Sequence, residues 1–303
     1  MLASLISFYI TSALQPILPI NINENIPIIE EASFNLSKLD FSGILSVSPI
    51  PIKKNSYIAP IIEATSVIAM DNQTGEILYE KNLHTRRQIA SITKLMTAII
   101  ILEENDLDSI VTVPQKANYA DGSQMFLRTG EQITVENLLY GLLINSANDS
   151  AETLAEHNAG SLDAFVEKMN KKALDLGLIN THFQNPVGYD HRKNYSSVYD
   201  IAKLSRYAYQ KAFIREATGI KELQVKSTDN QYIHDLESTN ELLDSYLNIK
   251  GLKTGHTDQA GLCLSAVAEN EQGNDIITVV LNSPARFKET KILIDWVFRA
   301  YIW

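Results

Sequence analysis

The sequence predicts an α/β (α+β) fold, in which an antiparallel sheet flanked by helices is built from both chain ends and an all-helical lobe is inserted between them. Residues 66–71 and 76–80 surround a turn-rich tetrad and predict a β-hairpin near the start of the folded region. Residues 262–268 and 276–281, separated by a polar turn, predict two strands near its end. Between about 115 and 220 the pattern is mainly helical, and this stretch is the predicted lobe.

The spacing of apolar residues predicts the individual helices. Residues 89–102 read IASITKLMTAIIIL, with apolar side chains on every face, which is typical of a buried helix. Thr134 stands just before apolar residues at helical spacing and is expected to cap the helix that they form. We expect a short strand at 110–113, and further helices at 149–157, at 162–176, from Ser197 onward and at 288–301.

Composition excludes several classes of protein. The 303 residues, 45% of them hydrophobic, suffice for one large domain or for two lobes that share a site. A net charge of −10 and the lack of a basic stripe argue against nucleic-acid binding. The single cysteine, Cys263, cannot form an internal disulfide and lies in an apolar run, as a buried core residue does. No Cys/His spacing suggests zinc, so we expect no metal site.

The N-terminal part of the chain differs from the rest. Residues 1–20 carry no charge and have the length of a signal peptide or a short N-terminal membrane anchor, although two prolines argue against a long straight spanning helix. The alternative is a buried N-terminal segment. Residues 21–60 show no sustained period and are interpreted as a linker. The catalytic domain is then expected at 61–303, and any membrane attachment at the N-terminus.

The tetrapeptide Ser91-Ile-Thr-Lys94 places a serine and a lysine on one face of the predicted helix, because positions i and i+3 share a face. A serine at a helix start meets unpaired backbone N–H groups and the positive end of the dipole, which favours a developing alkoxide. Lys94 is the only charged residue in its apolar helix, where burial lowers the pKa of an amine and makes it a candidate general base. The alternative is a lysine whose amine reaches the surface.

A second polar group, Ser146-Ala-Asn148, falls at the junction of two predicted helices. Its serine is a candidate for passing a proton between Lys94 and a leaving amine. The amide of Asn148 can both donate to and accept from a substrate amide. The alternative is helix capping, which serine and asparagine do well.

The third group, Lys253-Thr-Gly255, precedes the strand at 262–268. Lys253 supplies positive potential, Thr254 a hydroxyl donor for a carboxylate, and Gly255 lets a ligand backbone approach closely. The alternative is a plain turn with a surface lysine. Arg286 follows the last predicted strand and suits a substrate C-terminal carboxylate, with a surface salt bridge as the alternative.

These three groups, in this order, are typical of penicillin-binding proteins and class A β-lactamases. The chain resembles the low-molecular-mass D-alanyl-D-alanine carboxypeptidases of that superfamily over about residues 62–302. Segments similar to the family also include Gly122-Ser-Gln-Met125, Leu138–Leu143, Asn185-Pro-Val-Gly188, Ser238-Thr-Asn240 and Gly251–Thr257. The resemblance implies the β-lactamase/transpeptidase-like fold.

The resemblance also implies roles for the candidate residues. Ser91 would be the acylated nucleophile, Lys94 the base and Ser146 the proton relay. The backbone N–H groups of Ser91 and His256 would form the oxyanion hole, so the His256 side chain need not be catalytic. Contacts to substrate and carboxylate would come from Asn148, Lys253, Thr254 and Arg286. The sequence has Ala147 where the family often has glycine, and Asn194 where a histidine is commoner, which leaves the role of Asn194 open.

The activity implied is that of an exported serine D-Ala-D-Ala carboxypeptidase of the cell envelope, in the periplasm or on the outer face of the cytoplasmic membrane. It would remove the terminal D-alanine from peptidoglycan stem peptides through a Ser91 acyl-enzyme, without metal or cofactor, and so contribute to cell-wall synthesis and cell shape. β-Lactams would acylate the same serine. The alternatives are a DD-endopeptidase of cross-linked peptidoglycan, a β-lactamase, for which no Glu-x-x-x-Asn loop occurs among residues 160–195, and a non-catalytic β-lactam sensor.

Overall fold

The computed structural model describes residues 50–303, except for the side chain of Asn118. The predicted export segment, residues 1–20, and residues 21–49 of the predicted linker lie outside the described residues. The last part of that linker contains strand β1 (Ile52–Lys53), which pairs with β11 (Tyr301–Ile302). Within residues 50–303, no helix combines the length and the hydrophobicity needed to cross a bilayer.

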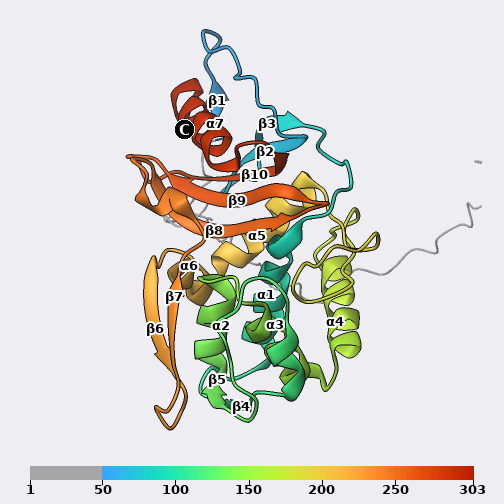
Figure 1. The fold of residues 1–303 in the computed structure, drawn as a ribbon. Coiled ribbons are helices and arrows are strands. Elements are labelled where there is room, and N and C mark those ends of the chain that lie inside the picture. Colours follow the sequence, from blue (N-terminus) through green and yellow to red (C-terminus); the bar gives the residue numbers. More distant parts are fainter. Residues whose placement is uncertain (1–49) are drawn as a thin grey trace, which may run out of the picture. The chain divides into compact units, whose positions relative to one another are not determined.

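The central sheet is antiparallel, and its five strands run in the order β3-β2-β10-β9-β8 (Figure 1). Strands β2 (Ser66–Asp71) and β3 (Ile77–Lys81) form the predicted hairpin at one edge. Strands β9 (Gly261–Glu269) and β10 (Asp275–Ser283) pair as predicted, and β10 also pairs with β2. Both ends of the described region therefore contribute to one sheet, and the predicted fold class is confirmed.

The opposite edge of the sheet is strand β8 (Asn248–Thr257), which carries the Lys253-Thr-Gly255 group. Gly255 lies opposite Cys263 of β9. The sequence pattern did not predict this strand, because its polar and glycine residues give no regular apolar alternation. The short 3₁₀ helix η3 (Ala90–Thr93) packs against β8 and also contacts β9.

Helices cover both faces of the sheet (Figure 1). Alternate residues of β2 show the division, since Val67 and Ala69 join one apolar cluster while Ile68 and Met70 join the other. The first cluster includes the buried side of α7 (Arg286–Ala300). This helix was predicted at 288–301 and begins two residues earlier. The second continues into the helical lobe through α5 (Val198–Gln210). Cys263 is buried in this second cluster, as predicted.

The helical lobe is built around α1 (Lys94–Glu104), whose first eight residues are all buried. The predicted helix at 89–102 therefore begins one turn late, because η3 forms its first turn. Thr134 and Ser197 cap their helices as predicted, accepting hydrogen bonds from the backbone N–H groups of Asn137 and Asp200 at 3.2 Å each. The other helices are α2 (Val135–Leu143), α3 (Asn148–Ala159), α4 (Leu162–Asp175) and α6 (Ala212–Ala217).

Short elements complete the fold. Strand β4 (Ile110–Thr112) was predicted, and it pairs with β5 (Gln132–Thr134), which was not. Strands β6 (Glu222–Lys226) and β7 (Ile233–Glu237) form a further hairpin beside the lobe. Every second residue of β7 is buried, but the exposed Ile233 and the buried His234 break the expected alternation of polar and apolar residues. The 3₁₀ helices η4 (Gln115–Tyr119) and η5 (Glu241–Asp244) lie in connections.

Candidate active site

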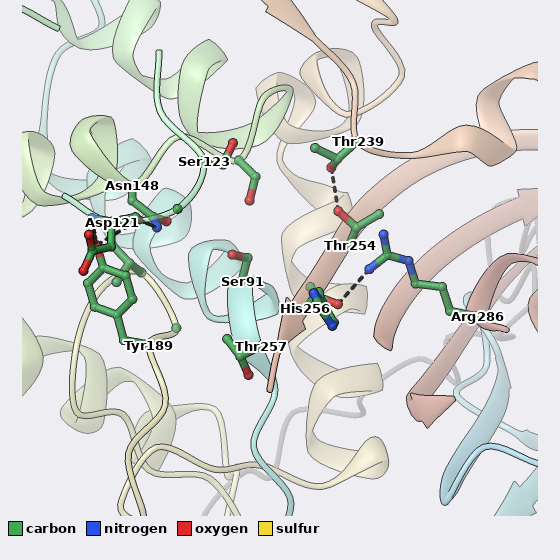
Figure 2. A pocket seen from close by; sticks show the side chains of 15 residues that line it. Ser91, Asp121, Ser123, Asn148, Tyr189, Thr239, Thr254, His256, Thr257 and Arg286 are labelled. Carbon is green, nitrogen blue, oxygen red and sulfur yellow. Dashed lines mark hydrogen bonds between the residues drawn. The ribbon is translucent and has the colours of Figure 1, made fainter. Parts of the chain in front are cut away.

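A cavity of about 330 Å³ opens between the helical lobe and the edge strand of the sheet (Figure 2). The structure brings residues of all three predicted groups to it. Ser91 lies between Asn148 on one side and Thr254 on the other (Figure 2). The predicted residues that line the cavity are Ser91, Ser146, Asn148, Thr254, Gly255, His256 and Arg286. The two lysines, Lys94 and Lys253, are buried next to residues of this lining.

Lys94 is fully buried, so the alternative of an amine reaching the surface is wrong. Its Nζ lies 2.8 Å from Ser91 Oγ and 2.9 Å from the carbonyl oxygen of Val187. Burial lowers the pKa of Lys94 well below its usual value, and the charge of Lys253 lowers it further, against the opposing carboxylates Asp149 and Glu152. As a neutral amine, Nζ can keep one N–H on the carbonyl and offer its lone pair to the serine hydroxyl.

The tight turn of η3 sets the geometry of this pair. In a 3₁₀ helix, side chains three residues apart eclipse one another, which places Ser91 and Lys94 on the same side. Two glycines press against the turn. A Cβ on Gly255 would lie 2.9 Å from the Ile89 carbonyl oxygen and 3.1 Å from the Ser91 nitrogen, and one on Gly188 would lie 2.0 Å from the Ala90 carbonyl oxygen. Only glycine permits β8 and the 188 loop to approach the nucleophile so closely.

The second group enters the cavity just before α3. Ser146 is 5% exposed and has a left-handed φ of 61°. The residue that caps α3 is Ala147, without a side-chain cap, so the helix-capping alternative for Ser146 and Asn148 is wrong. The Asn148 Nδ2 donates to the Asp121 carbonyl oxygen, while its buried Oδ1 has no hydrogen-bond partner within residues 50–303. That oxygen is available to accept an N–H from a substrate.

The third group makes the sheet side of the cavity cationic. Lys253 is 1% exposed within β8, so the alternative of a plain turn with a surface lysine is wrong. Its Nζ donates to the Thr254 carbonyl oxygen at 3.2 Å. Burial, with a contribution from the charge of Arg286, lowers the pKa of Lys253 to about 7. Two cationic side chains near one hydroxyl form a site suited to a carboxylate.

Arg286 begins α7 and points into the cavity from the sheet side (Figure 2). Its Nη1 donates to the Gly255 carbonyl oxygen at 2.8 Å, and burial lowers the pKa of its guanidinium. In the described part of the chain it forms no ion pair, so the predicted alternative of a surface salt bridge is wrong. The His256 side chain is exposed at the rim of the cavity.

Several residues of the site were not predicted from the sequence. Tyr189 accepts a hydrogen bond from the Asp121 backbone N–H at 3.0 Å and closes the lobe side of the cavity. Its loop is held by Asn185, whose Oδ1 accepts from the Gly188 and Tyr189 N–H groups at 2.6 and 3.0 Å. Asn194, whose role was open, donates to the Tyr189 carbonyl oxygen at 3.2 Å and so fastens the same loop. The segment Asn185–Gly188 was the only available signal.

Among residues 50–303, no group of three or more His, Cys, Asp or Glu side chains could hold an ion. The polar atoms around Ser91 are instead amine, hydroxyl, amide and guanidinium groups.

Known proteins are similar to this chain in both fold and sequence. Residues 53–285 match the family model described as D-alanyl-D-alanine carboxypeptidase. The D-alanyl-D-alanine carboxypeptidase DacF of Bacillus subtilis is 37% identical over 257 residues, which are 82% of this chain and 65% of the relative. DacA of Escherichia coli is 37% identical over 80% of this chain and 62% of its own length. The chain thus spans less than two thirds of these relatives.

A shorter relative, from Streptomyces, is covered almost completely. The D-alanyl-D-alanine carboxypeptidase of Streptomyces sp. strain K15 is 36% identical, over 85% of this chain and 93% of the relative. The crystal structure of the Streptomyces K15 DD-transpeptidase superposes with a TM-score of 0.76 at 34% identity, over 80% of this chain and 99% of that one. Penicillin-binding protein 5 of Haemophilus influenzae gives a TM-score of 0.73 at 34% identity, over 80% and 72%.

The fold is therefore that of the penicillin-binding class of serine proteins, in the β-lactamase/transpeptidase-like superfamily. Within that class, the chain belongs to the D-alanyl-D-alanine carboxypeptidase family.

Proposed function

We propose that this protein is a serine-type D-Ala-D-Ala carboxypeptidase that removes the terminal D-alanine from peptidoglycan stem peptides. One observation carries the proposal: a fully buried amine, Lys94 Nζ, lies 2.8 Å from the hydroxyl of Ser91 at the floor of a cavity with a cationic side. A buried amine with a lowered pKa can take the serine proton, and a cationic side can hold a terminal carboxylate. The family and the relatives named above are described as D-alanyl-D-alanine carboxypeptidases, which supports the same reaction.

The peptide would bind along the outer side of β8, as an added strand at the sheet edge. Its C-terminal carboxylate would lie among Lys253, Thr254 and Arg286, and its backbone N–H would donate to the unpaired Oδ1 of Asn148. This arrangement leaves the bond between the two D-alanines above Ser91. The exposed rim near His256 stays open to the remainder of the peptide.

In the first step, Lys94 takes the Ser91 proton while Oγ attacks the carbonyl carbon. The oxyanion would be stabilised by the backbone N–H groups of Ser91 and His256. Ser146 would pass the proton from Lys94 to the nitrogen of the leaving D-alanine, and the C–N bond breaks. In the second step, water attacks the carbonyl carbon of the Ser91 ester while Lys94 accepts the water proton. The C–Oγ bond then breaks, Lys94 returns the proton to Ser91 Oγ, and the shortened peptide leaves as a carboxylic acid.

The proposal includes the location of the reaction. Residues 1–20 are uncharged and apolar, which supports export to the cell envelope with an N-terminal signal or anchor. A peptidase of stem peptides must act where peptidoglycan is exposed, in the periplasm or on the outer face of the cytoplasmic membrane. Fractionation of cells that express the full chain tests this, because a cytosolic protein would contradict it.

The test of the activity is acylation with a fluorescent penicillin together with D-alanine release from a peptide that ends in D-Ala-D-Ala. We expect stable labelling, D-alanine release, and loss of both in Ser91→Ala. The matched control is Ser56→Ala, an exposed serine in the turn before Tyr57, which should behave as the parent protein. Rapid loss of the label would indicate a β-lactamase. Labelling without peptide cleavage would indicate a sensor, and cleavage of cross-linked dimers alone would indicate an endopeptidase.

A further inference from the structure

A second hydroxyl lies directly beside the threonine of the Lys253–Gly255 group. Thr239 Oγ1 is 2.5 Å from Thr254 Oγ1, and both side chains line the cavity (Figure 2). Thr254 is 4% exposed, so few water molecules compete for its hydroxyl. The proposed chemistry uses Thr254 but leaves Thr239 without a role.

Thr239 lies between the helical lobe and the edge strand β8 and is hydrogen-bonded to both. Its backbone N–H donates to the Ile144 carbonyl oxygen at 3.4 Å, two residues before Ser146. Its neighbours are fixed as well, since the Ser238 N–H donates to the Lys221 carbonyl oxygen at 2.7 Å and the Asn240 side chain caps η5. The backbone of Thr239 thus contacts the helical side, and its hydroxyl contacts the edge strand.

The hydrogen bond between the hydroxyls of Thr239 and Thr254 can run in either direction. Each hydroxyl carries one proton, so only one of the two donates within the pair, and the donor has no proton left for a ligand. If Thr254 donated to Thr239, it would turn lone pairs toward any anion in the cavity. If Thr239 donates to Thr254, the Thr254 proton is free to point at the anion. Lys253 and Arg286 on this side draw an anion there, so the second direction is favoured once a carboxylate binds.

We propose that Thr239 is a positioning residue for the substrate carboxylate, because its hydroxyl donates to Thr254 Oγ1 and thereby directs the Thr254 proton toward the carboxylate. The inference rests on the proposed function for the identity of that carboxylate. Successive hydrogen bonds in one direction polarise one another, so the bond from Thr254 to the anion is stronger with Thr239 behind it. Thr239 acts through Thr254 and takes no proton in the reaction.

The test compares two ligands on three variants. Second-order rate constants for acylation of Ser91 are measured with benzylpenicillin, which carries a carboxylate, and with its methyl ester, which does not. Thr239→Val keeps the shape and removes the donor, and we expect acylation by the carboxylate form to slow about tenfold, with less than a twofold change for the ester. Thr239→Ser keeps the hydroxyl and should restore the parent rate. Thr239→Ala should repeat the selective loss if the valine variant does not fold.

A double-variant cycle with Thr254→Val shows whether Thr239 acts through its neighbour. We expect Thr239→Val to cause no further loss in the Thr254→Val background. Equal slowing of both ligands, or losses that multiply in the double variant, would overturn the role of Thr239. These results are separate from the fate of the proposed function, because acylation rates remain measurable even if the parent protein labels with penicillin and releases no D-alanine.

Discussion

The buried amines near Ser91 and the buried imidazole of β7 show two opposite uses of burial. Lys94 and Lys253 are both enclosed, and within residues 50–303 neither forms an ion pair. Burial therefore lowers the pKa of each. His234, which is 5% exposed, lies 2.7 Å from the Glu131 carboxylate. Burial would lower the pKa of His234, but the hydrogen bond and charge of Glu131 offset this and raise it.

The opposite pKa shifts match two different roles: the lysines belong to the candidate active site, and His234 stabilises the fold. Without a counter-charge, the amine of Lys94 becomes neutral and can accept a proton, as a base must, whereas Lys253, with a pKa of about 7, keeps part of its charge at neutral pH. The imidazole instead faces two acceptors, because Nδ1 lies 2.8 Å from the Met125 carbonyl oxygen and Nε2 faces Glu131. Both nitrogens donate in the charged form, which ties β7 to the loop of Met125, and that loop also carries Ser123 of the cavity lining. Four measurements test the difference between the buried lysines and the pair of His234 and Glu131.

The largest effect is expected from Lys94→Met. Removal of the general base should slow penicillin acylation of Ser91 by about a thousandfold. The melting temperature should not fall, because methionine fills a similar volume and removes the cost of burying an amine. Stopped-flow acylation and calorimetry measure the two quantities. A rate within tenfold of the parent would show that Lys94 is not the base.

The second effect concerns the stability that the pair of His234 and Glu131 contributes. Glu131→Gln leaves a buried imidazolium without its counter-charge, and we expect the free energy of unfolding in urea at pH 6 to fall by about 3 kcal/mol. The matched control is Glu104→Gln, since Glu104 pairs with Lys168 at the surface at 2.6 Å. That change should lower the free energy of unfolding by less than about 1 kcal/mol. Equal losses would contradict the distinction between the two pairs.

A smaller effect is expected in the pH profile of acylation. Because the pKa of Lys253 is about 7, this amine loses its charge above neutral pH in the free protein. The rate constant for benzylpenicillin should therefore fall by about tenfold on the alkaline side, and the methyl ester should lack this decline. Lys253→Arg should keep the charge and remove the decline. A decline of the same size with both ligands would point to another group.

The smallest effect is the pH dependence of stability. Since the pKa of folded His234 is raised above 6.5, the contribution of the pair is complete below that pH and is lost as the pH rises through the folded-state value. The stability difference between the parent and Glu131→Gln should shrink by about 1.4 kcal/mol for each unit by which the pKa is raised. Urea titrations at pH 6 and pH 9 measure it. A difference that grows with pH would have the wrong sign.

Local patterns in the sequence predicted much of the fold and the chemical centre of the site. The hairpin of β2 and β3 follows from apolar segments around a turn, and the pair Ser91 and Lys94 lies three residues apart in one turn. Their neighbours Ser146 and Lys253 were found because each belongs to a short group with its own chemistry. The burial of Lys94 was foreseeable because Lys94 is the only charged residue in the mostly apolar stretch 89–102.

Residues placed by long-range packing could not be predicted in this way. Thr239 can be recognised only from its contacts with Thr254 and Ile144 in the folded protein. Tyr189 can be recognised only from its contact with Asp121, which is 68 positions away in the chain. Strand β8 was missed because its pairing with β9, and not its own pattern, makes it a strand. His234 gave no signal, since its partner Glu131 is 103 positions away.

The claim that Lys94 is a neutral general base for Ser91 is tested most directly by measuring its protonation in the free protein. NMR titration of lysine side-chain ¹³Cε signals, assigned with Lys94→Met and Lys253→Met, gives the pKa of each buried amine. We predict that the Lys94 signal titrates well below pH 10.5, in keeping with a base that is neutral when it meets the Ser91 hydroxyl. A Lys94 signal that titrates near 10.5, as an exposed lysine does, would contradict the account.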